Sequence, residues 1–386
     1  MLSHLLLAAI LAIPSGDDTV RVRSTTPPAW GTRIVLTPEF VIGQVDGPPE
    51  VAFGSIELLA ATRAGEFVLF DGADIQLRRY DRAGRFLGTI GRKGSGPGEY
   101  QRLQGLAWLG DSLLAAYDPA NARITLFAAT GEPRATIPIQ ARFFGDNAFV
   151  ADTAGQLWLR SVAGPPEGGT APVPTWYVRR DQRGQVRDSV PFLPLDPPSQ
   201  DFVLMTRDGP RWNFPSTPLA ALSPLGGLVT GHSSRLGFTV TSGFGRVLMV
   251  DREATPLPLT GAERAQWEAW SAHMAAQGRG TPRPLPSRKP LVRNLLVDPA
   301  GRVWLEVYAK AEERAPTPRR PGDTRPQLTL RDATTYEVFA ADGTYLGRIA
   351  LPPESQVLGI TPNRLWVFQR GPDDEERVAA YALPPR

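Results

Sequence analysis

The sequence predicts an all-β protein: a six-bladed β-propeller of four-stranded antiparallel blades with one helical insertion. Three observations support this fold class. The chain of 386 residues contains 38 glycines and 39 prolines, which break helices and favour turns between short strands. Short apolar runs, rich in β-branched and aromatic residues, recur between those turns. A unit of sequence also repeats after about 45 residues, the length of one propeller blade.

The repeat is clearest in the first two blades. Residues 65–91 and 111–139 each contain a strand that ends in aspartate, a tight turn, a second strand, a glycine turn and a third strand. The aspartates, Asp71 and Asp118, stand where a carboxylate can accept hydrogen bonds from the N–H groups of the turn. An inner strand is expected before each unit, at residues 55–61 and 104–109.

Four more blades follow with the same rhythm. The strands of blades three, four and five are expected within residues 148–193, 219–252 and 291–351. Blade six shows only three strands, between residues 356 and 383. We predict that residues 32–43 (TRIVLTPEFVIG) supply its fourth strand by pairing with residues 377–383. This pairing closes the ring and removes an open strand edge that would otherwise invite aggregation.

A glycine-rich stretch connects blades one and two. It contains Gly94, Gly96, Pro97, Gly98, Glu99 and Tyr100, and a D-x-x-N turn and the pattern R-I-x-L-F follow it. In these features the chain resembles bacterial six-bladed propellers related to NHL repeats. The resemblance is specific over residues 65–139 and returns in blade five. It implies the propeller fold and export, and it implies no particular reaction.

The N-terminus contains one long apolar run, residues 5–13. Nine helical residues reach about 14 Å, less than half of the ~30 Å hydrocarbon core of a bilayer. We therefore expect residues 1–16 to be a signal peptide rather than a membrane span, and the protein to be periplasmic or extracellular. The alternative is a frayed apolar N-terminus on a cytoplasmic protein. Residues 32–386 are expected to form a single propeller domain.

Long connections are expected on only one face of the propeller. In an antiparallel blade, the loop between the second and third strands opens on the same face as the connection to the next blade. The insertions at 163–175, 195–218, 254–289 and 309–334, together with residues 92–103, all belong to these two classes. Because loops of this length are functional or disordered, we expect the ligand site on this face, around the mouth of the central channel.

The insertion at 254–289 is predicted to contain a helix. Thr260 and Glu263 form a capping box, and Gly278 suits the end of the helix. Trp267, Trp270 and Met274 fall on one helical face. Two interpretations stay open: this face packs the helix onto the blades, or it belongs to a lid that borders a ligand.

The candidate ligand-binding residues lie on or near this mouth. They are Arg92, Lys93, Glu99, Tyr100, Arg142, His232, Trp267, Trp270 and Arg293. For most of them a structural role is the competing interpretation. The stretch GRKGSGPGE lacks the G-K-[ST] of a phosphate-binding loop, and we expect it to be a crossing between blades in which Glu99 holds backbone donors.

Composition narrows the chemistry. The chain has no cysteine, and besides His4 only His232 and His273 are available, so a multi-histidine zinc site cannot form. Six-bladed lactonases hold calcium with inner-strand oxygens, and Glu57, Asn147 and Asn294 are the candidates for such a site here. The net charge of +3, from 42 basic and 39 acidic residues, argues against a nucleic-acid-binding surface.

The sequence thus predicts an exported, soluble and monomeric binding module for a protein or small-molecule ligand, with no cofactor. Catalysis stays open. The alternative is a calcium-dependent lactonase-like hydrolase or lyase that uses the central channel.

Overall fold

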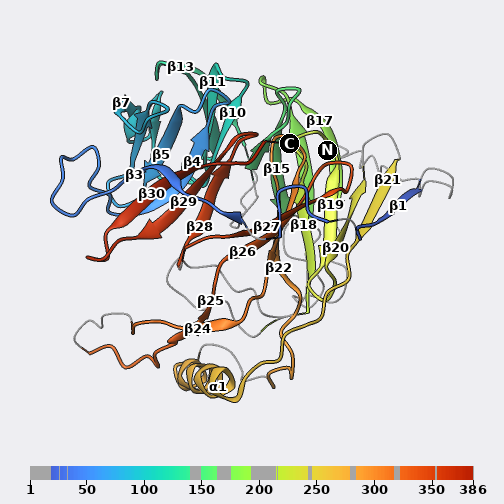
Figure 1. Cartoon of the computed structure of the whole chain (residues 1–386). Helices are drawn as coiled ribbons and strands as arrows, with labels where there is room; N and C mark the ends of the chain where they lie inside the picture. Colours follow the sequence, from blue (N-terminus) through green and yellow to red (C-terminus); the bar gives the residue numbers. More distant parts are fainter. Residues whose placement is uncertain are drawn as a thin grey trace.

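The fold is seen in a computed structural model, which describes residues 19–385 except 26, 33, 140–148, 163–174, 193–213, 215, 242–245, 279–283, 317–321 and 353. Within the described residues the chain forms six four-stranded antiparallel blades and a single helix, α1 (Gly261–Ala276) (Figure 1). The predicted fold class, a six-bladed propeller, is confirmed.

The strands are numbered along the chain, and those of each blade are named here from the inner to the outer edge. Blade one contains β4 (Ile56–Ala61), β5 (Phe67–Asp71), β6 (Gln76–Tyr80) and β7 (Phe86–Ile90). Blade two contains β10 (Gly105–Leu109), β11 (Leu113–Asp118), β12 (Arg123–Ala128) and β13 (Pro133–Pro138). Blade three contains β14 (Phe149–Ala151), β15 (Leu157–Val162), β16 (Thr175–Arg180) and β17 (Val186–Phe192).

The second half of the ring follows the same order. Blade four contains β18 (Pro218–Leu222), β19 (Leu228–His232), β20 (Gly237–Thr241) and β21 (Val247–Asp251). Blade five contains β22 (Val292–Val297), β23 (Val303–Val307), β26 (Thr335–Phe339) and β27 (Tyr345–Ala350). Blade six contains β28 (Gln356–Ile360), β29 (Arg364–Arg370), β30 (Glu376–Ala382) and β3 (Pro38–Ile42). The short strands outside the blades are β8 (Arg92–Lys93), β9 (Glu99–Tyr100), β24 (Ala311–Glu313) and β25 (Leu330–Asp332).

The ring closes through its N-terminal segment, as predicted. Strand β3 pairs antiparallel with β30, with Ile42 opposite Val378. Two preceding strands add a feature that the sequence pattern did not reveal. Strand β1 (Thr19–Arg23) runs parallel to β21, and β2 (Ile34–Val35) runs parallel to β27. We call residues 19–42 the strap, because its three strands border the outer edges of blades four, five and six in turn (Figure 1).

The predicted strand at 32–43 is therefore two strands that belong to different blades. Pro38 begins β3, and a proline has no N–H to continue the ladder of β2. The chain can thus leave blade five and join blade six at this point. Two contacts fix the crossing: Trp30 Nε1 donates to the carbonyl oxygen of Pro385 at 3.1 Å, and Glu39 pairs with Arg364 at 2.7 Å.

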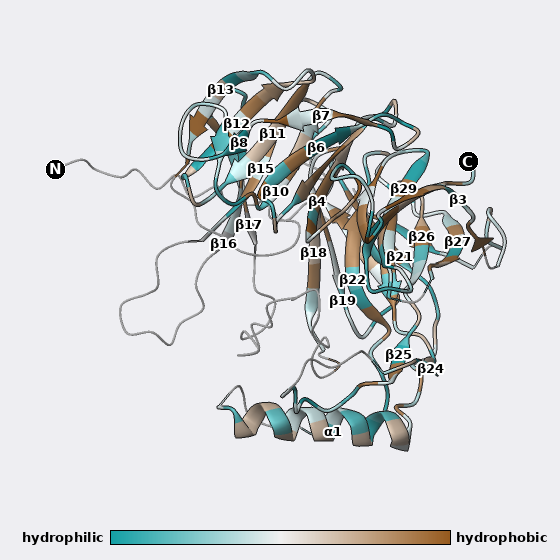
Figure 2. Cartoon of the chain, turned by 90° about the vertical axis from the view of Figure 1, so that its left-hand side faces the viewer, coloured by the Kyte–Doolittle hydropathy of each residue, from teal (hydrophilic) through white to brown (hydrophobic). Residues whose placement is uncertain are grey.

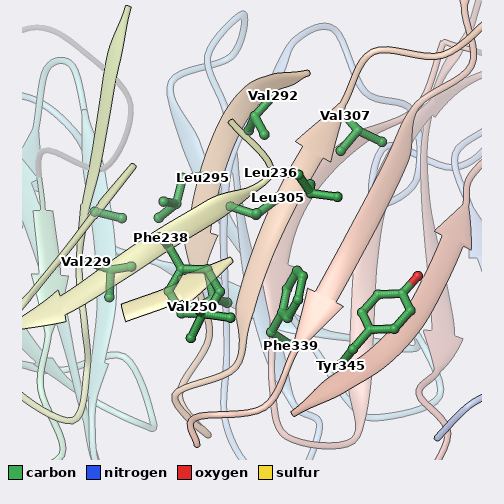
Figure 3. Close-up of a cluster of buried hydrophobic side chains, with 12 residues drawn as sticks. Val229, Leu236, Phe238, Val250, Val292, Leu295, Leu305, Val307, Phe339 and Tyr345 are labelled. Atoms are coloured by element: carbon green, nitrogen blue, oxygen red, sulfur yellow. The ribbon is translucent and has the colours of Figure 1, made fainter. Parts of the chain in front are cut away.

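The core lies between adjacent blades. All five residues of β5 and all five residues of β23 are buried, because each second strand is covered by a blade on both sides. Between blades four and five, Phe238 and Val250 face Phe339 and Leu305 (Figure 3). Burial of such side chains stabilises the fold by about 1.5–3 kcal/mol each, so a ring of blade interfaces supplies the cohesion that a single central core supplies elsewhere.

Turn chemistry sets the strand ends. The carboxylate of Asp71 accepts hydrogen bonds from the N–H groups of Gly54 and Ser55, at 3.0 and 2.9 Å, and from Ala73 at 3.1 Å. Asp118 accepts from Gln101 N–H in the same way, at 2.8 Å. Each aspartate therefore ties the turn after a second strand to the chain that enters the inner strand, which confirms the predicted turn role.

The two faces of the propeller differ in what they bear. We call the face with the second-to-third-strand loops and the blade-to-blade connections the insertion face. Helix α1 and the β24–β25 hairpin belong to insertions of this class and lie together to one side of the blades (Figures 1 and 2). With 16 residues that include Glu263 and Arg264, α1 is too short and too polar to cross a bilayer, and the described residues contain no other helix.

Candidate functional site

The insertion between blades four and five is a two-stranded stalk with α1 at its end. Leu259 N–H donates to the carbonyl oxygen of Ser287 at 3.0 Å, and Lys289 N–H donates to that of Leu257 at 2.8 Å. Residues 257–259 and 287–289 therefore run antiparallel, as the bridge between Pro258 and Arg288 also shows. We call the stalk, α1 and the β24–β25 hairpin together the cap.

The predicted helix start is confirmed. Thr260 is the N-cap residue: its Oγ1 accepts from Glu263 N–H at 3.2 Å, and Glu263 Oε2 accepts from Thr260 N–H at 2.9 Å. This capping box satisfies N–H groups that have no partner within the helix. At the other end Gly278 adopts a positive φ of 70°, which glycine permits without strain.

The tryptophan face of α1 packs inward. Trp270 is buried, and Trp267 is half-buried with its ring edge-on to Phe214 at a centroid distance of 5.5 Å. The ring of Phe214 in turn lies against that of Tyr308, with 5.4 Å between the ring centroids. Tyr308 directly follows the second strand of blade five. Gln266 ties α1 to the hairpin, because its side chain donates to Thr329 Oγ1 at 2.9 Å and accepts from Leu330 N–H at 3.1 Å.

A buried lysine links the parts of the cap. The Nζ of Lys289 lies 2.5 Å from Glu263 Oε1 on α1 and 2.6 Å from Asp332 Oδ1 on the hairpin. It also donates to the carbonyl oxygen of Ala309 at 2.9 Å. Only 1% of the lysine side chain is exposed. All three ammonium protons thus have partners, which is the arrangement that a buried ammonium group requires.

The same network reaches the inner strand of blade five. Arg293 Nη2 lies 2.9 Å from Asp332 Oδ2, and Arg293 Nη1 lies 3.5 Å from Glu306 Oε1. A bulge between Val292 and Asn294 takes Arg293 out of the strand ladder, and such bulges re-aim side chains. We call Lys289, Glu263, Asp332 and Arg293 the cap pin, because together they join stalk, helix, hairpin and inner strand.

The electrostatics favour the charged forms of two members of the cap pin, Glu263 and Arg293. Burial by itself would raise the pKa of Glu263, but the hydrogen bonds from Lys289 and from Thr260 lower the pKa below its ordinary value. Burial would likewise lower the pKa of Arg293, and the neighbouring Glu306, Tyr308 and Asp332 raise it instead. The pin is thus a set of mutually compensating charges, and removal of one member leaves its partners buried without compensation.

The glycine-rich crossing uses its candidate residues internally. Arg92 Nε pairs with Glu99 Oε1 at 2.8 Å, and Glu99 Oε2 accepts from Gly96 N–H at 2.7 Å. Tyr100 is buried: its hydroxyl donates to Ile90 O at 2.8 Å and accepts from Leu77 N–H at 2.9 Å. The backbone donor held by Glu99 confirms the expected blade crossing.

The remaining candidates are dispersed. Lys93 is exposed on β8, and His232 ends β19 with its Nδ1 2.7 Å from Ser234 Oγ. Arg142 lies outside the described residues. The structure brings Arg92, Glu99 and Tyr100 together in the crossing. It places Trp267 and Trp270 on α1 in the cap, and Arg293 on the inner strand β22, where it joins the cap pin. Among the described residues no contact joins these two groups.

The calcium candidates do not meet in the part of the chain that the structure describes. Glu57 is exposed at a bulge of β4, with Ser55 Oγ 3.5 Å from its Oε1. The Oδ1 of Asn294 accepts from Leu295 N–H at 2.9 Å, and Asn147 lies outside the described residues. Those residues contain no group of three or more His, Asp or Glu side chains placed to hold a metal ion.

Of the four cap-pin residues, sequence reasoning selected only Arg293 as a candidate for the site. Glu263 was identified only as a helix cap, and Asp332 was not identified at all. One signal existed: Lys289 is one of three lysines in a chain of 42 basic residues, and it lies in the same insertion as the helix. Nothing local in the sequence marks its partners.

Comparison with known proteins finds similarity to solved structures only. No protein-family model and no curated protein sequence matches it. One of these structures is a protein from Bacteroides fragilis that is described as exported. It has a TM-score of 0.49 and 10% sequence identity, and the match covers 95% of this chain and 100% of the other. A DUF4221 family member from Bacteroides vulgatus has a TM-score of 0.48 and 11% identity, and the match covers 90% of this chain and 97% of the other. Regucalcin from Agrobacterium tumefaciens, a calcium-binding protein, has a TM-score of 0.41 and 13% identity, and the match covers 92% of this chain and 97% of the other.

Proposed function

We propose that this protein is an exported binding module whose ligand docks on the insertion face, against the cap and the mouth of the central channel. In this proposal residues 1–16 are a signal peptide, and the relation to NHL-repeat propellers concerns architecture rather than RNA binding. The ligand is a protein or a small molecule. The candidate residues nearest to it are Trp267 on α1 and Arg293 on the inner strand.

One observation carries the proposal: the cap is a built structure and not a loose connection. Its stalk, helix and hairpin are joined by a lysine that is 1% exposed and lies within 2.6 Å of two carboxylates. Burial of such charges is costly unless the geometry is well satisfied. A segment that only linked two blades would need neither a helix nor a buried ion network, because connections of 2–6 residues suffice in compact domains.

The test compares the intact chain with a variant in which residues 260–286 are replaced by a short Gly-Ser linker. Both proteins are immobilised and exposed to the periplasmic or extracellular fraction, and bound proteins and small molecules are identified by mass spectrometry. We expect at least one species to be retained by the intact chain and lost from the variant. A control variant with a Gly-Ser replacement of residues 82–84, in a turn of the opposite face, should retain that species.

Equal recovery of every species by the intact chain and the cap variant would contradict the proposed role of the cap. Both variants must keep the unfolding transition of the blades, followed by circular dichroism, so that loss of a species reports on the cap.

A further inference from the structure

Two adjoining hollows lie at blade four, and no member of the cap pin lines them. The larger, of about 640 Å³, lies between the 234–236 turn and residues 251–255. The smaller, of about 410 Å³, extends along the edge strand β1. Asp251, Arg252 and Glu253 line both. We call the combined hollow the rim groove. Its larger part lies in the size range of small-molecule sites, about 300–1,000 Å³.

The rim groove is positively charged. Four arginines line it against two carboxylates, and they are Arg21, Arg23, Arg235 and Arg252. Arg235 pairs with Asp251 at 2.5 Å, and Arg23 pairs with Glu253. Both pairs are at least half exposed at their side chains. Exposed pairs of this kind contribute only about 0–1 kcal/mol, so their guanidinium groups can turn to a ligand at little cost.

The other two arginines have no carboxylate partner among the described residues. Arg21 is exposed on β1. Arg252 is half-buried, and its guanidinium lies 3.8 Å from the centre of the Tyr345 ring. Arg252 Nη1 donates to the carbonyl oxygen of Ser24 at 2.9 Å. A guanidinium group has five N–H donors in a planar fork. Within the part of the chain that the structure describes, the side chain of Arg252 uses one of them, in the bond to Ser24.

The ring beneath Arg252 is itself fixed. The hydroxyl of Tyr345 donates to Glu337 Oε2, and Glu337 also binds Arg348 Nε at 2.8 Å. On the other side, Ser24 N–H donates to Asp251 O at 2.9 Å. The strap and blade five thus hold Arg252 from two directions. A donor that is positioned before binding loses little entropy when a ligand arrives.

From these observations we propose that the rim groove binds a small ligand that bears an oxyanion: a phosphate, a sulfate or a carboxylate. Arg252 supplies the fixed, bidentate donor. Arg21 supplies a second positive charge from the strap, and Ser234 and Thr255 line the larger hollow. The site does not depend on the proposed function of the cap, because no member of the cap pin lines it.

The test is isothermal titration calorimetry of the full chain with inorganic phosphate, sulfate and acetate at low ionic strength. We expect saturable binding of at least one anion, weakened by salt because the charges are partly exposed. Arg252→Gln should weaken it at least tenfold, which corresponds to about 1.4 kcal/mol. Arg21→Gln should weaken it two- to fivefold. The matched control is Arg63→Gln, an exposed arginine in a tight turn after β4, and it should bind as the wild type does.

Two results would overturn the proposal: no saturable binding of any of the three anions, or equal affinity in Arg252→Gln, Arg21→Gln and Arg63→Gln. Because Arg252 also packs on Tyr345, its variant could lose stability. Arg21 is exposed and stacks on no aromatic ring of the described residues, so its variant keeps the test decisive. Selectivity for phosphate and sulfate over acetate would assign a tetrahedral oxyanion, and the reverse would assign a carboxylate. A Lys289→Met variant should bind the anion unchanged, which separates this site from the cap.

Discussion

The sharpest test of the cap is the replacement Lys289→Met, which keeps an unbranched side chain, one atom shorter, and removes its charge. In the wild type this ammonium group contacts Glu263, Asp332 and the carbonyl oxygen of Ala309 within 2.9 Å. After the replacement, two buried carboxylates lose their shared cation. Removal of one partner of a buried ion pair costs about 3–5 kcal/mol.

The surroundings place the loss near the lower end of that range. Asp332 keeps Arg293 at 2.9 Å, and Glu263 keeps the N–H of Thr260 at 2.9 Å. We therefore expect the free energy that holds the cap closed to fall by about 3 kcal/mol. At 1.4 kcal/mol per factor of ten, the cap should open about 100-fold more often.

Hydrogen exchange of the α1 amides measures this opening, because the cap can open while the blades stay folded. Protection over residues 264–276 should fall about 100-fold in Lys289→Met, with little change in β5 or β23. The matched control is Lys310→Met, which removes the same charge from an exposed lysine without an ion pair among the described residues. Equal protection of α1 in the two variants would show that Lys289 does not stabilise the closed cap.

Acid should act on the same contact. The folded-state pKa of Glu263 is lowered: burial opposes the shift, and the hydrogen bonds from Lys289 and Thr260 cause it. The stabilisation is therefore complete above the unfolded pKa of about 4.3 and is lost as the pH falls through the lower folded value. Protection of α1 in the wild type should decline below about pH 4.3, whereas Lys289→Met should show a flatter profile. Parallel profiles in the two proteins would contradict this linkage.

Four further outcomes follow from the structure. Thr260→Ala removes the capping box and should lower the stability of the cap by about 1 kcal/mol, seen as faster exchange at the start of α1; unchanged exchange would contradict the capping role. Tyr100→Phe leaves a buried N–H and a buried carbonyl without their partner and should lower the free energy of unfolding by about 2 kcal/mol in urea. Because burial raises the pKa of Tyr100 to about 12, the wild type and Tyr100→Phe should show the same ultraviolet titration of tyrosine around pH 10. A smaller titration there in Tyr100→Phe would show that the hydroxyl is exposed. Deletion of residues 19–42 should leave the outer edge of β30 open and cause aggregation, whereas deletion of residues 19–24 should leave the closure of blade six intact. Size-exclusion chromatography distinguishes the two variants. Equal behaviour of both would show that β3 does not protect the edge of β30.

Much of the fold could be predicted because its causes are local. Turn residues such as Asp71 act on N–H groups beside them, and apolar runs mark strands that blades cover on both faces. The two residues of the capping box, Thr260 and Glu263, are three positions apart, so the sequence also predicts the helix start. The closure of blade six followed from counting strands, since a ring with one missing strand must receive it from the other end of the chain.

The candidate site was less predictable because its contacts join distant parts of the chain. Glu263, Lys289 and Asp332 are separated by 26 and 43 positions, and each is an ordinary polar residue in its own segment. Of the residues selected from the sequence, Glu99 and Tyr100 satisfy the backbone of a blade crossing. Arg252 was not selected, because its fixed position depends on a ring in blade five and a carbonyl in the strap.

By itself the sequence determined the number of blades, the order of their strands, the helix and the face that bears the insertions, since repetition, periodicity and turn chemistry are written along the chain. Only the tertiary structure decided which outer edges β1 and β2 join and which charges meet beneath the cap. Strand pairing at an edge and ion pairing in a buried space depend on the proximity of segments in three dimensions, and no local pattern encodes that proximity.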